Sequence, residues 1–278
     1  MSGKLYVIGT PIGNLSDLSP RAIETLKTVD FIAAEDTRVT MKLMNRFEIK
    51  RPVISYHEHN MRGSGTRIMD RILSGENCAV VSDAGMPAIS DPGQDLVRLA
   101  HENGITVVSV PGPSAVITAL AISGLECGRF CFEGFLSVTK SERRTHLDEL
   151  KNERRTMVFY EAPHKLLATL KDMYAAFGDR PVAVIKELTK IHESVMHTTF
   201  SQAAEYFSEN TPKGEYVLVV SGAEKKDSAV TFEKAVEYAR SCVEDGMAPT
   251  AAAKQAAQMS GQRRSDIYKA LASSQDSI

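Results

Sequence analysis

The chain has 278 residues, of which 43% are hydrophobic and 24% are charged, and its formal net charge is −2. This length allows two domains with cores of their own. The charge gives no overall basic field for nucleic acid, so any such contact must come from local patches. No apolar run approaches the ~20 residues of a membrane span, and the N-terminus lacks a signal-peptide pattern. We therefore expect a cytoplasmic protein without a membrane partner.

The first part of the chain alternates short apolar runs with helical patterns. The runs typical of buried strands lie at 5–8, 31–34, 53–55, 79–81 and 106–110. Helical patterns lie at about 37–47, 65–74 and 93–103, and Ser19-Pro20 has the residue types of an N-cap and first helical position. Such alternation is typical of βαβ units in a mainly parallel sheet covered on both faces. It predicts an N-terminal α/β domain over 1–113.

The pattern changes after Gly124. Strand-like runs lie at 130–132, 156–160, 182–185, 194–200 and 216–220, with helical patterns at 141–151, 163–177 and 201–209. Polar and apolar side chains alternate along 194–200, which favours a half-exposed, antiparallel strand. These features predict a second α/β domain over 114–224 with a mixed sheet.

The last segment, 229–278, follows a polar linker and has only helical patterns. We predict helices at 232–243, 250–259 and 264–271, with Thr250 as a cap, Gly261 as a turn and Ser265-Asp266 at the start of the last helix. Two short helices around a glycine turn resemble a helix-turn-helix. Between Lys254 and Lys269 there are four basic residues and one acidic residue. A solvated tail and a nucleic-acid contact both fit this pattern.

Two loops rich in small residues follow neighbouring strands of the first domain. They are 82–93, which is rich in Gly, Pro, Ser and Asp, and 110–115, which contains Pro-Gly-Pro. Ligands of open α/β sheets bind outside the carboxyl ends of the strands. The edge of the sheet that carries these loops is therefore the candidate site.

The first loop, 9–14, lacks the glycine spacing of dinucleotide-binding and P-loop sequences. Pro11 also removes a backbone N–H that a phosphate cradle would use. The small polar loops suit a nucleoside with a zwitterionic amino-acid end, such as S-adenosylmethionine. Its carboxylate would fit the helix start at 113–115. Plain turn chemistry is the alternative reading of the same loops.

Six short motifs together resemble the tetrapyrrole methylase superfamily, and within it the branch that acts on ribosomal RNA. They are 9–15, 35–38, 55–60, 82–93, 111–115 and 160–164. The resemblance covers Leu5 to about Gly222. It implies two α/β domains with S-adenosylmethionine in the cleft between them, usually in a homodimer. It also implies 2′-O-methylation of a decoding-centre cytidine in 16S ribosomal RNA of the small ribosomal subunit.

Ten positions of this chain match cofactor-binding positions of the superfamily. Those in the first domain and at the start of the second are Pro11, Asp83, Ala84, Gly85, Met86, Ser114 and Ala115. Those that the resemblance places over the adenosine are Tyr160, Leu188 and Glu215. Ser82 and Ala84 replace the usual Gly and Pro of the superfamily's Gly-Asp-Pro loop, as they do in the ribosomal RNA branch.

Methyl transfer to a ribose hydroxyl needs alignment and removal of a proton, and a positioned general base accelerates it by about 10²–10⁴-fold. Polar clusters after two strands of the first domain are the candidates for this chemistry. We expect substrate-side roles for Glu35, Asp36, Arg38, His57, Glu58 and Asn60, with a carboxylate or His57 as the base. Capping and surface ion pairs are the alternative roles. We expect no metal, because His57 and His59 lack identifiable further ligands.

Two other functions stay open at this point. The first is methylation of a small tetrapyrrole, which the helical tail and the 57–60 cluster disfavour. The second is a non-catalytic RNA-binding assembly factor with a vestigial cofactor cleft.

Overall fold

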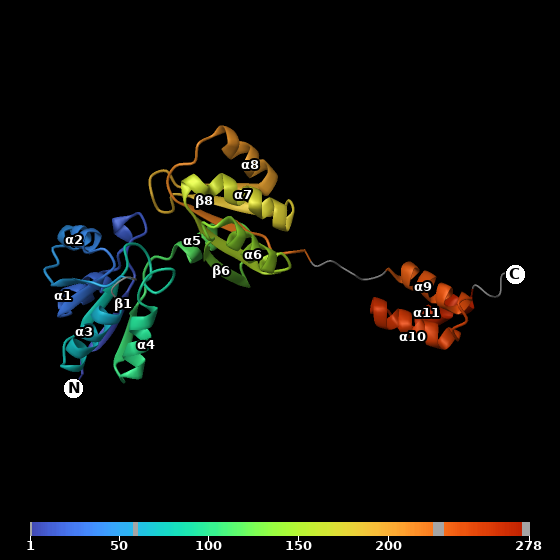
Figure 1. The fold of residues 1–278 in the computed structure, drawn as a ribbon, viewed down its shortest axis with the longest axis horizontal. Helices are drawn as coiled ribbons and strands as arrows, with labels where there is room; N and C mark the ends of the chain where they lie inside the picture. Colours follow the sequence, from blue (N-terminus) through green and yellow to red (C-terminus); the bar gives the residue numbers. More distant parts are fainter. Residues whose placement is uncertain (1, 58–60, 225–230, 274–278) are drawn as a thin grey trace. The chain divides into compact units, whose positions relative to one another are not determined.

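The computed structural model describes residues 2–57, 61–224 and 231–273, and the chain divides into two compact units, Met1–Ala223 and Glu224–Ile278. Figure 1 shows the helices and strands of each unit. The first unit contains two sheets, and the second contains helices. The α/β class is confirmed. The division of the first unit near residue 113 stays a prediction.

The first sheet is entirely parallel, as its continuous apolar runs predict. Its strands are β1 (Lys4–Ile8), β2 (Phe31–Ala34), β3 (Val53–Ser55), β4 (Cys78–Val81) and β5 (Thr106–Val110). Their order is β3-β2-β4-β1-β5. β1 pairs with β4 and β5, and β2 pairs with β3 and β4, all in parallel. The carboxyl ends of all five strands therefore meet at one edge.

Two helical layers bury the two faces of this sheet. Leu5 packs in one core with residues of α3 (Met61–Leu73) and α4 (Gln94–Glu102). Ile8 packs in the other core with residues of α1 (Pro20–Thr28) and α2 (Thr37–Arg46). Ser19 caps α1 as predicted, because its hydroxyl accepts a hydrogen bond of 3.1 Å from the amide of Ala22.

The second sheet is mixed, again as predicted. Its strands are β6 (Phe130–Phe135), β7 (Thr156–Glu161), β8 (Pro181–Lys186), β9 (Ser194–Thr199) and β10 (Tyr216–Val220). Their order is β6-β7-β10-β8-β9. β6 and β7 are parallel, whereas β10 is antiparallel to β7 and β8, and β8 is antiparallel to β9.

Helices cover both faces of this second sheet. α6 (Lys140–Leu150), α7 (Pro163–Phe177) and α8 (Phe200–Glu209) pack on one face, where α7 and α8 lie side by side (Figure 1). α5 (Ala115–Ile122) packs on the other face. Phe200, expected at the end of a strand, instead begins α8. Its ring is fully buried, 6.2 Å from that of Phe177, and this packing favours the helical start.

In residues 231–273, the described part of the second unit, three helices pack around mainly small side chains. Its helices are α9 (Phe232–Glu244), α10 (Pro249–Ser260) and α11 (Arg264–Ala272). Thr250 is not the cap of α10: Ala248 is the N-cap and Pro249 is the first helical residue, where proline loses no hydrogen bond. α11 begins at Arg264, as predicted, and extends one residue beyond the predicted end at Leu271. Within the described ranges, no helix has the length and apolar character to cross a lipid bilayer.

Candidate functional site

Three loops that follow β1, β4 and β5 are joined by hydrogen bonds at one edge of the first sheet. The amide of Thr10 donates to the carbonyl of Gly85 over 2.9 Å, and the amide of Gly85 donates back over 3.1 Å. The Thr10 hydroxyl, in a residue only 1% exposed, donates to the carbonyl of Ser82 over 3.1 Å. Buried polar groups require such partners. Thr10 therefore fixes the first loop against the 82–93 loop.

Two glycines let the first and third loops touch backbone to backbone. The amide of Gly9 donates to Val110 over 3.2 Å. A Cβ added at Gly112 would lie 2.7 Å from the carbonyl oxygen of Gly9, closer than side chains tolerate. Gly112 is thus needed here for the close approach of the two loops, which places the start of α5 beside the first loop.

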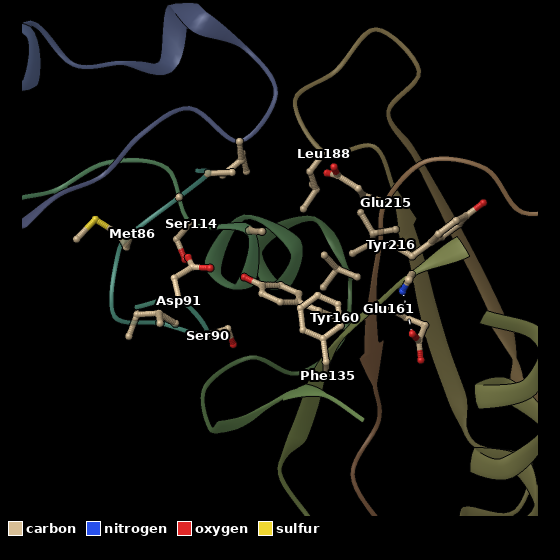
Figure 2. Close-up of a pocket in the computed structure, with 18 of the residues that line it drawn as sticks. Met86, Ser90, Asp91, Ser114, Phe135, Tyr160, Glu161, Leu188, Glu215 and Tyr216 are labelled. Carbon is tan, nitrogen blue, oxygen red and sulfur yellow. Dashed lines mark hydrogen bonds between the residues drawn. The ribbon is translucent and has the colours of Figure 1, made fainter. Parts of the chain in front are cut away.

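These loops form one wall of a cavity of about 370 Å³, and the second sheet forms the facing wall. Figure 2 shows the residues around it. This volume is within the range of small-molecule sites. The lining residues are Ile12, Ala84, Gly85, Met86, Ile89, Ser90, Asp91, Ser114, Ala115, Phe135, Tyr160, Glu161, Ala162, Pro163, Ile185, Leu188, Glu215, Tyr216 and Val217.

Aromatic side chains form the second-sheet wall. The rings of Phe135 and Tyr160 are 5.4 Å apart, and that of Phe132 is 4.9 Å from Tyr160. The Tyr160 hydroxyl accepts a hydrogen bond from the backbone amide of Val116 in α5. Burial and then the charge of Asp91 raise the pKa of Tyr160 to about 12, so this hydroxyl stays protonated near neutral pH. This wall therefore gives flat apolar ring surfaces, with the Tyr160 hydroxyl as a polar group at the end of one ring.

A buried carboxylate fixes the segment next to Tyr160. Glu161 is only 4% exposed. One of its oxygens accepts from the amide of Ala162 over 2.8 Å, and the other accepts from the hydroxyl of Thr169 over 2.5 Å. Its charge lies at the start of α7, where the helix dipole favours an anion. Glu161 thereby holds the end of β7 against the cavity.

The 82–93 loop has an unusual backbone where it lines the cavity. The backbone φ angles of Ala88 and Ser90 are 70° and 64°, values that residues other than glycine rarely adopt. The amide of Ala88 donates to the carbonyl of Pro92 over 3.3 Å and closes a short turn around Asp91. Burial, followed by the charge of Glu35, raises the pKa of Asp91 to about 6.

The substrate-side candidates form a separate polar cluster at the ends of β2 and β4. The amide of Asp36 donates to Asp83 over 3.1 Å, and the amide of Asp83 lies 3.5 Å from a carboxylate oxygen of Glu35. Burial and the charge of Asp83 raise the pKa of Glu35. Asp36 caps α2 and forms a two-point ion pair with Arg38, which lowers the pKa of Asp36 to about 2. Asp36 is therefore a poor proton acceptor.

Eight of the ten predicted cofactor positions line the cavity, and two do not. The eight are Ala84, Gly85, Met86, Ser114, Ala115, Tyr160, Leu188 and Glu215. Pro11 and Asp83 are outside the lining, as are Glu35, Asp36, Arg38 and His57. Glu58 and Asn60 lie outside the described residues. All of these roles stay predictions.

Several residues of the cavity were not singled out from the sequence. Asp91 and Ser90 belong to the motif loop, but nothing in its composition marks which side chains face inward. Phe135 follows a bulge in β6 between Phe132 and Gly134, a register shift that sequence periodicity does not reveal. In the described part of the chain, no group of three or more His, Cys, Asp or Glu side chains is arranged to hold a metal ion. His59 lies outside that part.

Comparison with known proteins agrees with this two-sheet architecture. Residues 4–204 match the family described as Tetrapyrrole (Corrin/Porphyrin) Methylases. A crystal structure of uroporphyrin-III C-methyltransferase from Thermus thermophilus, complexed with S-adenosyl homocysteine, has the same fold. It superposes with a TM-score of 0.55 at 16% identity, over 79% of this chain and 97% of that one. The chain belongs to the tetrapyrrole methylase family.

Two curated relatives are more similar in sequence to this chain than that solved structure is, and both have the same name. The chain is 47% identical to the ribosomal RNA small subunit methyltransferase I of Synechocystis sp. over 269 residues, which are 96% of each protein. It is also 47% identical to the protein of that name from Thermotoga maritima over 222 residues. These are 80% of this chain and 100% of the Thermotoga protein.

Proposed function

We propose that this chain transfers a methyl group from S-adenosylmethionine to the ribose 2′-hydroxyl of a decoding-centre cytidine in 16S ribosomal RNA. One observation carries the proposal: nearly the whole chain is 47% identical to a relative named for methylation of small-subunit ribosomal RNA. The nucleotide and the 2′-oxygen come from the sequence resemblance. The protein would act in the cytoplasm, as a homodimer, on RNA within the small ribosomal subunit.

The chemistry of the cavity fits S-adenosylmethionine, the cofactor expected of a methyltransferase in this family. Phe135, Tyr160 and Leu188 give apolar surface for the adenine ring. Ser114 and Ala115 lie where α5 begins, and the amides there suit the cofactor's carboxylate. When bound, the cofactor supplies an electrophilic methyl group, so the protein mainly has to orient and deprotonate the acceptor.

The remaining site residues would hold the RNA. Glu35, Asp36 and Arg38 lie at the same edge of the first sheet as the loops of the cavity, and His57 follows β3 at that edge. We assign them, together with Glu58 and Asn60, to the substrate side. In the second unit, Arg263 and Arg264 are exposed at the start of α11. The start of the second helix is where helix-turn-helix proteins contact nucleic acid, so we assign this position to RNA binding by analogy.

Labelled methyl transfer to small ribosomal subunits from a strain that lacks the modification tests the proposal. The expected result is one labelled 2′-O-methylcytidine per subunit in the decoding centre. Label in a base, in another nucleotide or only in an added tetrapyrrole would refute the assigned substrate. Binding of the cofactor without any transfer to subunits or naked RNA would instead support a non-catalytic assembly factor.

A further inference from the structure

The second unit carries its charges unevenly. Residues 231–248, which contain α9, have two basic and four acidic side chains. Residues 249–273, which contain α10 and α11, have four basic side chains and one acidic side chain. The two helices around the Gly261 turn therefore form the positive part of this unit, and they offer the charge complementarity that a polyanion requires.

The exposed face of α11 combines two of these cations with an aromatic ring. One side of this helix is buried in the core of the unit. On the other side, Arg264 and Tyr268 lie one helical turn apart, and Lys269 follows Tyr268 directly. Both cations are exposed, and 42% of the surface of Tyr268 is accessible. This face of α11 therefore presents a ring between two positive charges.

Tyr268 also borders a groove of about 250 Å³ between α11, the second half of α9 and the start of α10. Pro249 and Leu271 give this groove apolar surface. Arg240 and Glu244 add polar groups to its lining. A nucleobase is a flat ring with a polar edge, so a groove that joins an aromatic side chain, apolar surface and polar groups matches its chemistry.

The shape of RNA helices determines which form of RNA suits this surface. The major groove of paired RNA is deep and narrow, so a helix cannot reach the base edges there as a helix-turn-helix does in DNA. Proteins bind unpaired RNA instead by stacking its bases on aromatic rings and by neutralising its phosphates with Lys and Arg. Tyr268 provides such a ring, and Arg264 and Lys269 provide the cations beside it.

We propose that the second unit binds an unpaired stretch of RNA, with one base stacked on Tyr268 and the neighbouring phosphates on Arg264 and Lys269. This inference rests on the proposed function and names the form of RNA that the second unit recognises. The contact adds affinity for the substrate and takes no part in methyl transfer, because every residue that lines the cofactor cavity belongs to the first unit. The Thermotoga maritima relative agrees with this division, since 222 residues of this chain match its whole length and the first unit has 223.

The test uses the full chain and compares Tyr268→Leu, which loses the ring but stays apolar, with Tyr268→Phe, which keeps the ring. Tyr174→Leu, at a similarly exposed tyrosine of α7, is the matched control. Fluorescence anisotropy measures binding to a labelled unpaired oligoribonucleotide and to the same oligoribonucleotide paired with its complement. We expect Tyr268→Leu to raise the dissociation constant for the unpaired RNA about 5- to 150-fold, the equivalent of about 1–3 kcal/mol for one stacked base. Tyr268→Phe and Tyr174→Leu should stay within about twofold of wild type, and none of the three variants should change binding of the paired RNA.

Salt dependence separates a stacked base from a phosphate contact. Arg264→Gln and Lys269→Gln should each make the slope of the logarithm of the binding constant against the logarithm of salt concentration shallower by about 0.7. Tyr268→Leu should leave this slope unchanged, because the loss of a stacked base changes no counterion release. A Tyr268→Leu protein whose second unit had unfolded would lose the phosphate contacts as well, so an unchanged slope also shows that the unit is intact.

Methyl transfer to unmodified small ribosomal subunits connects this contact with the proposed function. Tyr268→Leu should raise the KM for subunits and leave the rate at saturating subunit concentration as in wild type. This is the pattern of a residue that contributes equally to binding of the ground state and of the transition state.

The outcomes distinguish this inference from the proposed function. If wild type modifies subunits and Tyr268→Leu binds unpaired RNA as tightly as wild type does, the inference is wrong although the proposed function stands. An equal loss of binding to paired RNA would mean that α11 lies against a duplex, and this too would overturn the inference. If wild type does not modify ribosomal RNA at all, the proposed function itself fails.

Two other results would contradict the stacked base in particular. Failure of Tyr268→Phe to bind like wild type would assign the contact to the hydroxyl and not to the ring. A weaker interaction of Tyr268→Leu with subunits, together with unchanged binding to both forms of RNA, would make a ribosomal protein the partner of this surface.

Discussion

Gly112→Ala tests whether the close contact of the first and third loops builds the cavity. The new Cβ would lie 2.7 Å from the oxygen and 2.8 Å from the carbonyl carbon of Gly9. Side chains essentially never approach closer than 3.0 Å, so the loops must separate by at least 3.0 − 2.7 = 0.3 Å. The obstacle is backbone on a neighbouring loop, which cannot rotate away. The 111–115 segment must therefore move relative to the first loop.

The cost of this movement can be estimated from overpacking, which destabilises proteins by about 1–3 kcal/mol. For a domain of this size, each kcal/mol lowers the melting temperature by about 2–4 °C. Ser114 and Ala115 line the cavity directly beyond Gly112, so the cofactor site moves as well. Loss of one hydrogen bond, about 1 kcal/mol, would raise the dissociation constant of S-adenosylmethionine about fivefold.

Thermal unfolding and calorimetry, each with Gly128→Ala as the control, measure both effects. A Cβ at Gly128 meets nothing within 4 Å, so this variant should match wild type in both measurements. A Gly112→Ala protein with unchanged stability and unchanged cofactor affinity would refute the reasoning. It would mean that the contact between these loops does not shape the site.

Three further predictions concern the first loop and the tail. Thr10→Val leaves the carbonyl of Ser82 without its buried hydrogen-bond donor. Denaturant titration should therefore show a free energy of unfolding lower by about 1–3 kcal/mol. Thr28→Val, at an exposed position, is the control and should change this free energy little. Charge reversal at Arg263 and Arg264 should weaken RNA binding. The slope of the logarithm of the binding constant against the logarithm of salt concentration should become shallower by about 0.7 per lost phosphate contact. An unchanged slope would mean that these two residues do not contact RNA. A chain ending at residue 223 contains the whole first unit and should bind S-adenosylmethionine as wild type does. The reason is that the 222 aligned residues span the whole Thermotoga maritima relative. A loss of binding would mean that the cofactor site needs the second unit.

Much of the fold is predictable because its signals are local. Continuous apolar runs such as 31–34 mark strands buried on both faces, and Ser19-Pro20 marks the start of α1. The predicted ends of helices and strands are wrong where tertiary packing or a single residue determines where the element begins. Phe200 leaves the expected strand because its ring packs beside Phe177, and Pro249 moves the start of α10 ahead of Thr250.

The site is predictable only in part, for a different reason. Residues 82–93 and 111–115 were identified from composition and resemblance, and they do form one wall of the cavity. The backbone conformation at Ala88 and Ser90 determines which side chains of the loop face the cavity. Neither alanine nor serine is a residue type that predicts a positive φ angle. On the facing wall, the resemblance predicts Tyr160, Leu188 and Glu215, which do line the cavity. Phe135 follows the bulge in β6, which periodicity in the sequence does not reveal.

The most direct test of the central claim is a crystal structure of the protein with S-adenosylhomocysteine. We expect the ligand in the cavity, with its adenosine between Tyr160 and Leu188 and its amino-acid end at Ser114 and Ala115. Ligand bound at another surface, with this cavity left empty, would contradict the account.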